Sequence, residues 1–239
     1  KLTINTFDNG RKFISGNRCD KPTARKAEGV QFDLYDYKLR LLEDYRHSDI
    51  PKERSRGTIG IPMGLNMYEM LPFWHTLFTR LGFNVITSPN SSRKLYLSGQ
   101  HTIPSDTVCF PAKLMHGHIE ALLKEGADAI FYPCLSYNFD EGLGDNHYNC
   151  PVVAYYPEVL EANVKALRDV KFIYEYLGIH RRKDFTKKFH AVLEKYFGKI
   201  KFSEVMMACN YAYEEHDKHM RLVRMEGRKY LRIAERENR

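Results

Sequence analysis

Residues 58–87 read TIGIPMGLNMYEMLPFWHTLFTRLGFNVIT, and this stretch decides the fold. It begins with a run typical of a buried strand and ends with a second apolar strand. Between them, residues 67–81 place apolar side chains at helical spacing, and Gly82 is a typical helix stop. Pro72 lies inside this stretch, so the helix is expected to begin near that residue. A strand–helix–strand unit with short links predicts parallel strands joined by a right-handed crossover.

The same alternation continues along the chain. Residues 111–124 predict a helix that ends at a glycine, and residues 129–132 predict a third strand. Residues 134–150 are rich in Tyr, Asn, Asp and Gly without an apolar period, so we expect a long loop, which inside a compact domain is usually functional or disordered. Residues 151–155, Pro-Val-Val-Ala-Tyr, predict a fourth strand. We therefore predict an α/β fold, a three-layer Rossmann-like parallel sheet, over residues 57–180.

Two further regions flank this domain. Residues 1–56 form an N-terminal extension and linker, in which an Asn-Gly turn between two short apolar runs predicts a hairpin. Residues 181–239 form a basic helical region that is expected to lead to a further lobe, with one long charged helix over 202–239. All of the net charge of +7 comes from this region, since residues 1–180 are neutral. Acidic residues are interleaved with the basic ones, so a solvated helix surface is favoured and nucleic acid is not an expected partner.

The size and the cysteine content narrow the class of protein. The chain has 239 residues, enough for one large domain with or without an appendage. No apolar run approaches the ~20 residues that span a bilayer, and no signal-peptide core follows Lys1. We therefore expect no membrane partner and a cytoplasmic location, and the missing initiator Met indicates a piece of a longer protein. In a reducing compartment, the five cysteines favour metal ligation or free thiols over disulfides.

Two of these cysteines fall where a parallel sheet places reactive groups. Cys109 directly precedes the helix expected at residues 111–124, and Cys134 directly follows the strand expected at residues 129–132. Both thiols should therefore lie at the carboxyl end of the sheet, the usual binding edge of such folds. Unpaired N–H groups at the start of a helix stabilise a thiolate, which is the form that binds metal or attacks electrophiles. We therefore expect Cys109 and Cys134 to be metal ligands.

The neighbouring residues and the other cysteines complete the candidate site. Lys113 and His116 lie near the helical face of the first thiol and could hold negative charge, so we expect them to bind a cofactor. Cys150 ends the long loop, and if a strand follows it, it lies at the opposite edge of the sheet, so its role as third ligand stays open. Cys209 lies on the long helix and is expected to be a packing residue. Cys19 could ligate a metal together with cysteines upstream. The alternative for each lone cysteine is a small buried side chain.

Common catalytic and nucleotide-binding motifs are absent. The sequence contains no G-x-G-x-x-G, G-x-x-x-x-G-K-[ST], H-E-x-x-H or G-x-S-x-G pattern. His118 and Glu120, followed by Pro133 and Cys134, resemble part of a zinc deaminase motif, but Tyr137 occupies the place of its second cysteine. A zinc deaminase site would therefore lack a ligand, and the sequence does not identify a substrate.

Four longer stretches carry a resemblance to a known family. They are IGIPMGLNMYE (59–69), PFWH (72–75), IPSDTVCFPAK (103–113) and NCPVVAYYPE (149–158). These stretches resemble the acyl-CoA dehydratase activase-related proteins of anaerobes, in their uncharacterised CoA-enzyme-activase domain, which is related to 2-hydroxyacyl-CoA dehydratase subunits. The resemblance covers about residues 57–239, and residues 13–20 look like the stretch that precedes this domain.

This resemblance implies a redox function. In the family, the region is joined to an ATP-hydrolysing activase portion, and relatives hold iron–sulfur clusters, here expected to be of the four-iron type, through few cysteines between Rossmann-like lobes. Electrons are driven to low potential by ATP. Cys109 and Cys134 fall where dehydratase-type subunits place cluster cysteines. Because this chain has no ATPase motif, an activase portion or subunit is its expected partner.

The leading hypothesis is an iron–sulfur redox module of a 2-hydroxyacyl-CoA dehydratase/activase-type system. Cys109 and Cys134 would be ligands and Cys150 a candidate third ligand. The alternative is a non-catalytic docking domain that makes contact through its basic tail, or a domain that binds acyl-CoA at the same edge of the sheet. Whether the chain is itself an enzyme stays open between these hypotheses.

Overall fold

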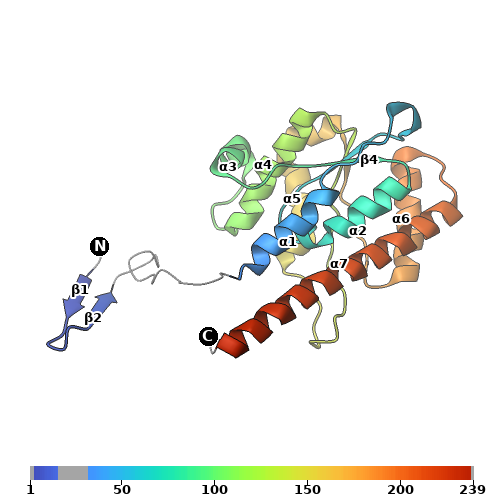
Figure 1. The fold of residues 1–239 in the computed structure, drawn as a ribbon. Helices are drawn as coiled ribbons and strands as arrows, with labels where there is room; N and C mark the ends of the chain where they lie inside the picture. The colour runs from blue at the N-terminus through green and yellow to red at the C-terminus, as the bar shows by residue number, and fades with distance from the viewer. Residues whose placement is uncertain (1–2, 16–31, 238–239) are drawn as a thin grey trace.

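The computed structural model describes residues 3–15 and 32–237, and its centre is a four-stranded parallel sheet (Figure 1). The strands are β3 (Thr58–Ile61), β4 (Asn84–Thr87), β5 (Ala129–Phe131) and β6 (Lys171–Ile173). Their spatial order is β4-β3-β5-β6, and each neighbouring pair is parallel. The predicted α/β fold with a parallel sheet is therefore confirmed, although most of the described residues are helical.

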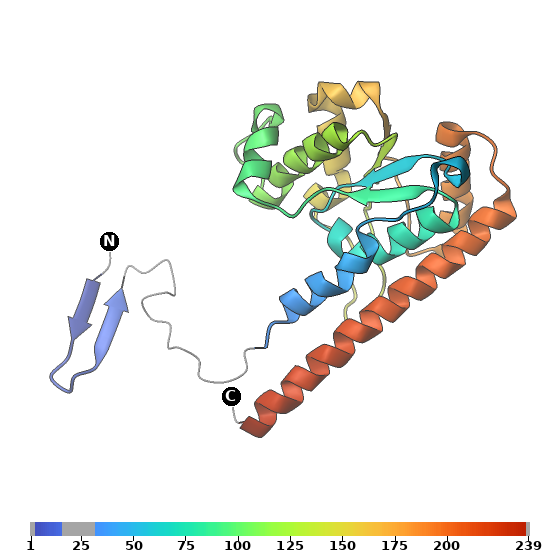
Figure 2. The same ribbon diagram turned by 45° about the horizontal axis from the view of Figure 1, so that its top comes forward.

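Helices cover both faces of this sheet. The α-helices are α1 (Leu34–Leu42), α2 (Met67–Arg80), α3 (Arg93–Gly99), α4 (Phe110–Glu125), α5 (Pro151–Asn163), α6 (Arg182–Phe197) and α7 (Phe202–Glu237). Short 3-10 helices lie at η1 (Glu43–Tyr45), η2 (Lys52–Arg54), η3 (Gln100–Thr102) and η4 (Lys165–Asp169). Figure 2 shows α2 between the sheet and α7, with α3, α4 and α5 across the opposite face. No helix in the described part of the chain is long and apolar enough to cross a bilayer.

The two flanking regions contain the elements that the sequence predicts. β1 (Thr3–Thr6) and β2 (Lys12–Ser15) form the antiparallel hairpin expected from the Asn-Gly turn. Gly10 in that turn has φ +75°, a left-handed conformation that glycine adopts without strain. At the other end, α7 is a single helix of 36 residues, as its charged sequence predicts. It packs along α2 and α6, and α1 also lies against it (Figure 1).

The fourth strand expected at residues 151–155 is wrong, because these residues begin helix α5. Pro151 occupies the start of the helix, where its missing N–H has no intrahelical partner to lose. The N–H of Ala154 bonds the carbonyl of Cys150 at 2.9 Å and so closes the first turn. The actual fourth strand is β6, which pairs with β5. A short apolar run fits a strand or a buried helix equally well, and here the leading proline favours the helix.

Helix α2 begins earlier than expected, at Met67 rather than near Pro72. The N–H of Met70 bonds the carbonyl of Asn66 at 3.2 Å, so the first turn is already formed before the proline. Pro72 removes only the hydrogen bond that the carbonyl of Tyr68 would otherwise accept near the helix start. The loss of one bond is offset by burial, because Pro72 itself is buried in the core.

Aromatic side chains fill the core between the sheet and helices α2, α6 and α7. Trp74 of α2 is fully buried, and its ring centroid lies 4.7 Å from that of Phe131 in β5. Phe185 and Phe189 of α6 stack on each other at 5.4 Å in the same cluster. Burying side chains of this size stabilises the fold by on the order of 2 kcal/mol each. The cluster therefore fixes β5 and the start of the loop that follows it.

Helices α3 and α4 cross at two glycines. A Cβ on Gly99 would lie 2.8 Å from the Cα of Gly117, and a Cβ on Gly117 would lie 2.7 Å from the carbonyl carbon of Leu95. Real Cβ atoms do not approach backbone atoms this closely, so only glycine allows the two helices to touch here. The contact places η3, with its Thr102, directly beside α4.

The segment before the domain covers the outer edge of β4. His47 forms an isolated bridge with Ile86, and the N–H of Ser48 bonds the carbonyl of Val85 at 3.1 Å. The side chain of Asn84 accepts the N–H of residue 50 at 2.7 Å and donates to its carbonyl at 2.8 Å. The linker expected around residues 48–57 therefore lies along the sheet and uses the free hydrogen-bonding groups of its edge strand.

Candidate functional site

Helices α4 and α5 both begin at the carboxyl edge of the sheet, because each returns the chain to the start of the next parallel strand. Just beyond the end of α4, the carboxylate of Asp128 accepts a hydrogen bond from the N–H of Thr58, the first residue of β3, at 2.8 Å. The end of α4 therefore lies at the amino edge, and its start lies at the carboxyl edge. Ligands of open α/β sheets bind at the carboxyl edge.

Cys109 is the residue immediately before α4, so its predicted place at a helix start is confirmed. Its side chain is exposed and makes no capping hydrogen bond. Lys113, one turn farther along, donates its ammonium to the carbonyl of Asp106 at 2.7 Å. This bond ties the helix to the loop before it. The thiol is therefore open to solvent at the amino end of the helix.

His116 lies on the buried side of α4 and joins three elements. Its Nδ1 is 2.7 Å from the hydroxyl of Thr102 in η3, and its Nε2 is 3.0 Å from the hydroxyl of Tyr156 in α5. Burial, with a smaller contribution from His101, lowers the pKa of His116 to about 4. The imidazole is therefore uncharged at neutral pH. Cofactor binding by Lys113 and His116 stays a prediction.

Cys134 lies beyond the carboxyl end of β5, as its sequence position predicts, but its side chain is fully buried. Its N–H bonds the carbonyl of Glu175 at 3.1 Å, and its own carbonyl accepts the N–H of Leu177 at 3.1 Å. Burial raises the pKa of the Cys134 thiol to about 12, and the carboxylate of Glu158 acts in the same direction. At neutral pH this sulfur therefore carries its proton.

Cys150 lies at the carboxyl edge, and the expectation that a following strand would place it at the opposite edge is wrong. The residue is the N-cap of α5, and α5 starts at the same edge of the sheet at which β5 ends. Asn149, the preceding residue, makes two hydrogen bonds to the loop that leaves β5. Its main-chain nitrogen lies 3.0 Å from the carbonyl oxygen of Ser136, and its side-chain amide nitrogen lies 2.8 Å from the carbonyl oxygen of Leu135. Cys150 is exposed. Three cysteines from three segments therefore belong to one edge of the sheet.

These thiols do not form a complete metal site by themselves. Within residues 3–15 and 32–237, no group of three or more His, Cys, Asp or Glu side chains is placed to hold a metal ion. Cys209 of α7 is buried, where burial raises its pKa to about 11, and it bonds Thr186, which agrees with the expected packing role. The predicted contribution of Cys19 lies outside the described residues.

Comparison with known protein families decides the relationship. The model of the CoA enzyme activase uncharacterised domain matches residues 58–239, more than half of the chain. The chain belongs to this family. The resemblance of its four sequence stretches is thereby confirmed. No curated protein and no solved structure matches the chain.

This CoA enzyme activase domain also contains a cavity that the sequence did not indicate. It has a volume of about 350 Å³ and lies between α1, the start of α2 and α7. Lys38 and Glu69 form an ion pair in its wall, and His219 of α7 lines the side opposite. The wall comes from three segments that are far apart in the sequence, so no local pattern shows that they meet. The one local signal is Leu65, whose φ of +51° turns the chain from β3 into α2.

The cysteines of this domain should differ sharply in their reactivity toward a water-soluble disulfide reagent. In a Cys19→Ser background, Cys109 and Cys150 are expected to react within minutes, because both side chains are exposed. Cys134 and Cys209 should react only after denaturation, since burial keeps both thiols protonated and covered. Mass spectrometry of the labelled peptides distinguishes the four sites. Rapid native labelling of Cys134 would contradict its place in the core.

Proposed function

We propose that this domain contributes cysteine ligands to an iron–sulfur site in a 2-hydroxyacyl-CoA dehydratase/activase-type system. The observation that carries the proposal is the position of Cys109 and Cys150, two exposed cysteines at the starts of helices α4 and α5 on one edge of the sheet. We infer a three-layer Rossmann-like domain, since helices cover both faces of the sheet (Figure 2). In such a domain this edge is the usual place for a ligand.

The donor set agrees with an iron–sulfur cluster in kind but not in number. Thiolates are the usual ligands of these clusters, and both exposed cysteines lie at the amino ends of helices. Cys134 would have to lose a proton and become uncovered before it could bind iron. The described residues therefore offer two ready ligands, and the proposal requires further donors from outside them.

A bound cluster would supply one-electron transfer at low potential, which limited ligation and exclusion of water both favour. The residues of this chain would hold the site in place and keep it dry on one side. Tyr132 directly follows β5 and is fully buried. Burial raises its pKa above its usual range, and the nearby Cys134 and Cys109 act in the same direction. The hydrogen bonds of His116 join η3, α4 and α5 and so fix the start of α4 against α5.

The test is anaerobic reconstitution of the chain with ferrous iron and sulfide, followed by analysis of both elements. Wild-type protein is expected to retain iron and acid-labile sulfide together. Cys109→Ser and Cys150→Ser should each lose most of both, because each removes one of the two accessible thiols. The matched control is Cys209→Ala, which removes a buried thiol on α7 and should leave the iron content unchanged.

One result would remove the proposal altogether. If a variant lacking both Cys109 and Cys150 retains as much iron as the wild type, these thiols do not hold the metal. The family relationship would stand, and other residues would hold the iron. Wild-type protein that retains no iron and sulfide would leave a docking or acyl-CoA-binding domain as the remaining interpretation.

A further inference from the structure

A groove runs between the first half of α6 and the first turns of α7. It has a volume of about 250 Å³. Its walls come from two antiparallel helices of the same hairpin. The lining residues are Arg182, Lys183, Thr186, Lys187, Phe202, Met206 and Asn210.

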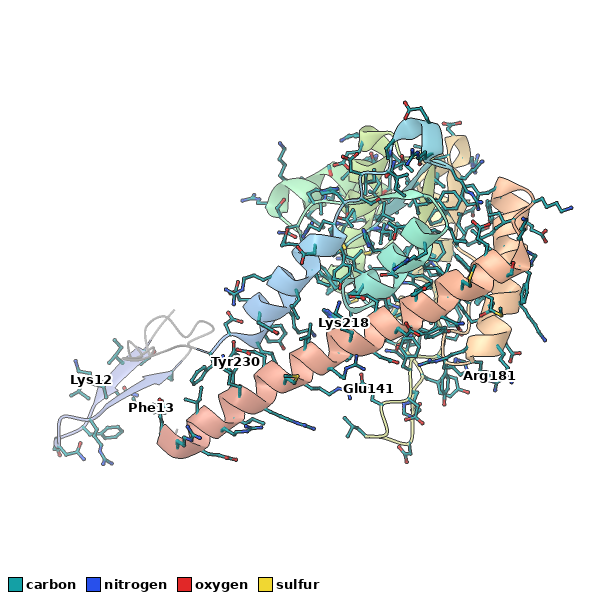
Figure 3. The ribbon with its side chains drawn as sticks, turned by 45° about the vertical axis from the view of Figure 1, so that its right-hand side comes forward. Lys12, Phe13, Glu141, Arg181, Lys218 and Tyr230 are labelled. Carbon is teal, nitrogen blue, oxygen red and sulfur yellow. The ribbon has the colours of Figure 1, made fainter. Side chains whose placement is uncertain are left out.

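One wall of the groove is strongly basic. Lys183 and Lys187 are exposed and make no ion pair with any residue in the described part of the chain. Arg182 pairs with Asp217 at 3.2 Å and lies over the ring of Tyr213 at 4.5 Å, so its position is fixed. Arg181 directly precedes α6 and adds a further cation at the same end (Figure 3). The positive potential of this wall is therefore largely uncompensated.

The other wall is apolar and exposed. Phe202 and Met206 lie one helical turn apart on α7 and are 43% and 44% exposed. The ring of Phe202 is held edge-on by His190 of α6 at 5.3 Å. Apolar side chains that gather beside unpaired cations mark a protein contact more often than a plain solvated face.

We propose that this groove docks an acidic amphipathic helix of a partner protein. Apolar side chains at i and i+4 of that helix would cover Phe202 and Met206, and its carboxylates would meet Lys183 and Lys187. From Phe202 to Asn210 the groove follows α7 for about 12 Å, so it accommodates about two turns of the partner. The occupant is a peptide and not a nucleic acid, because Phe202 and Met206 make one wall mainly apolar and neither side chain can donate to a phosphate.

The probe is a fluorescent peptide of about 14 residues with Leu at i, i+4 and i+7 and Glu on the flanking positions. Fluorescence anisotropy should show saturable binding that weakens as the salt concentration rises from about 0.05 M to about 0.5 M. The double variant Lys183→Glu/Lys187→Glu is expected to bind at least about tenfold more weakly, because like charges then face each other. Met206→Ser should also weaken binding severalfold while leaving the charge unchanged.

Three controls make the proposal falsifiable: a variant on another helix, a rearranged peptide and a single-stranded oligonucleotide. Arg93→Glu/Lys94→Glu makes the same charge change on the exposed face of α3, far from α6 in Figure 1, and should bind as the wild type does. A peptide of the same composition, with its leucines spread over all faces of the helix, should bind at least about tenfold more weakly. Equal binding of both peptides, unchanged binding by the Lys183/Lys187 variant, or tighter binding of a single-stranded oligonucleotide would each overturn the proposal.

Discussion

Acidification from about pH 7.5 to about pH 5 is expected to remove on the order of 2 kcal/mol of folding free energy for each of three buried histidines. These are His116, His118 and His216, which are at most 7% exposed. Burial is the main reason that each has a pKa of about 4 in the folded chain. The unfolded chain has the ordinary value of 6.5 for all three.

The sign follows from which state takes up protons. Above pH 6.5 both states leave these imidazoles neutral, so they contribute no pH dependence. As the pH falls from 6.5 toward 4, the unfolded chain binds protons that the folded chain does not bind. The free energy of unfolding therefore decreases. The total free energy of unfolding of a protein domain is about 5–15 kcal/mol. We therefore expect cooperative unfolding at a pH not far below 5.

Urea unfolding at the two pH values measures this effect. His118 lies between the hydroxyls of Ser88 (2.8 Å) and Ser91 (3.0 Å), so His118→Asn removes its titration while keeping a polar side chain. The variant should lose about 2 kcal/mol less than the wild type between the two pH values. His101→Asn is the control, because that side chain is 68% exposed. Imidazole titration by NMR with all three pKa values near 6.5 would refute the explanation.

Gly99→Ala and Gly117→Ala are each expected to destabilise the fold by about 3 kcal/mol or more, because the added methyl meets backbone atoms of the facing helix. Backbone cannot rotate away as a flexible side chain can, so α3 must move as a whole. That movement would also draw Thr102 away from His116 and loosen the start of α4. The free energy of unfolding, from urea titration at neutral pH, measures the loss directly.

The control for these variants is Gly144→Ala in the loop between β5 and α5. A methyl group there meets nothing within 4 Å, so its effect should stay within about 0.5 kcal/mol. Iron retention and peptide binding can be followed in the same proteins. If the Gly99→Ala variant is as stable as the wild type, α3 and α4 do not cross as closely as described.

The sequence predicts much of the fold because several signals are local. Apolar strand residues, Gly126 at the end of α4 and the Asn-Gly turn each depend on their immediate neighbours, and all three are found where expected. The cysteine positions at the ends of β5 and before α4 follow from the same alternation. The mistaken strand at residues 151–155 arose because a short apolar run has no helical period long enough to recognise.

The remaining features depend on contacts between distant segments. β6 begins with an exposed lysine and has only three residues, so nothing local distinguishes it from a loop. The burial of Cys134 depends on its pairing with residues 175–177, and the cavity beside Lys38 depends on α1 and α7 meeting α2. The corrected edge for Cys150 follows only once α5 is known to be a helix.

The segment around His47 and Ser48 gives the sheet one closed side and one open side. Its main-chain and side-chain bonds occupy the groups of β4 that another strand would need. β6 has no such cover from any described strand. Another extended chain, such as a segment of a misfolded copy, could therefore extend this sheet only by pairing with β6. A fibril that grows by adding strands at both edges of the sheet is blocked.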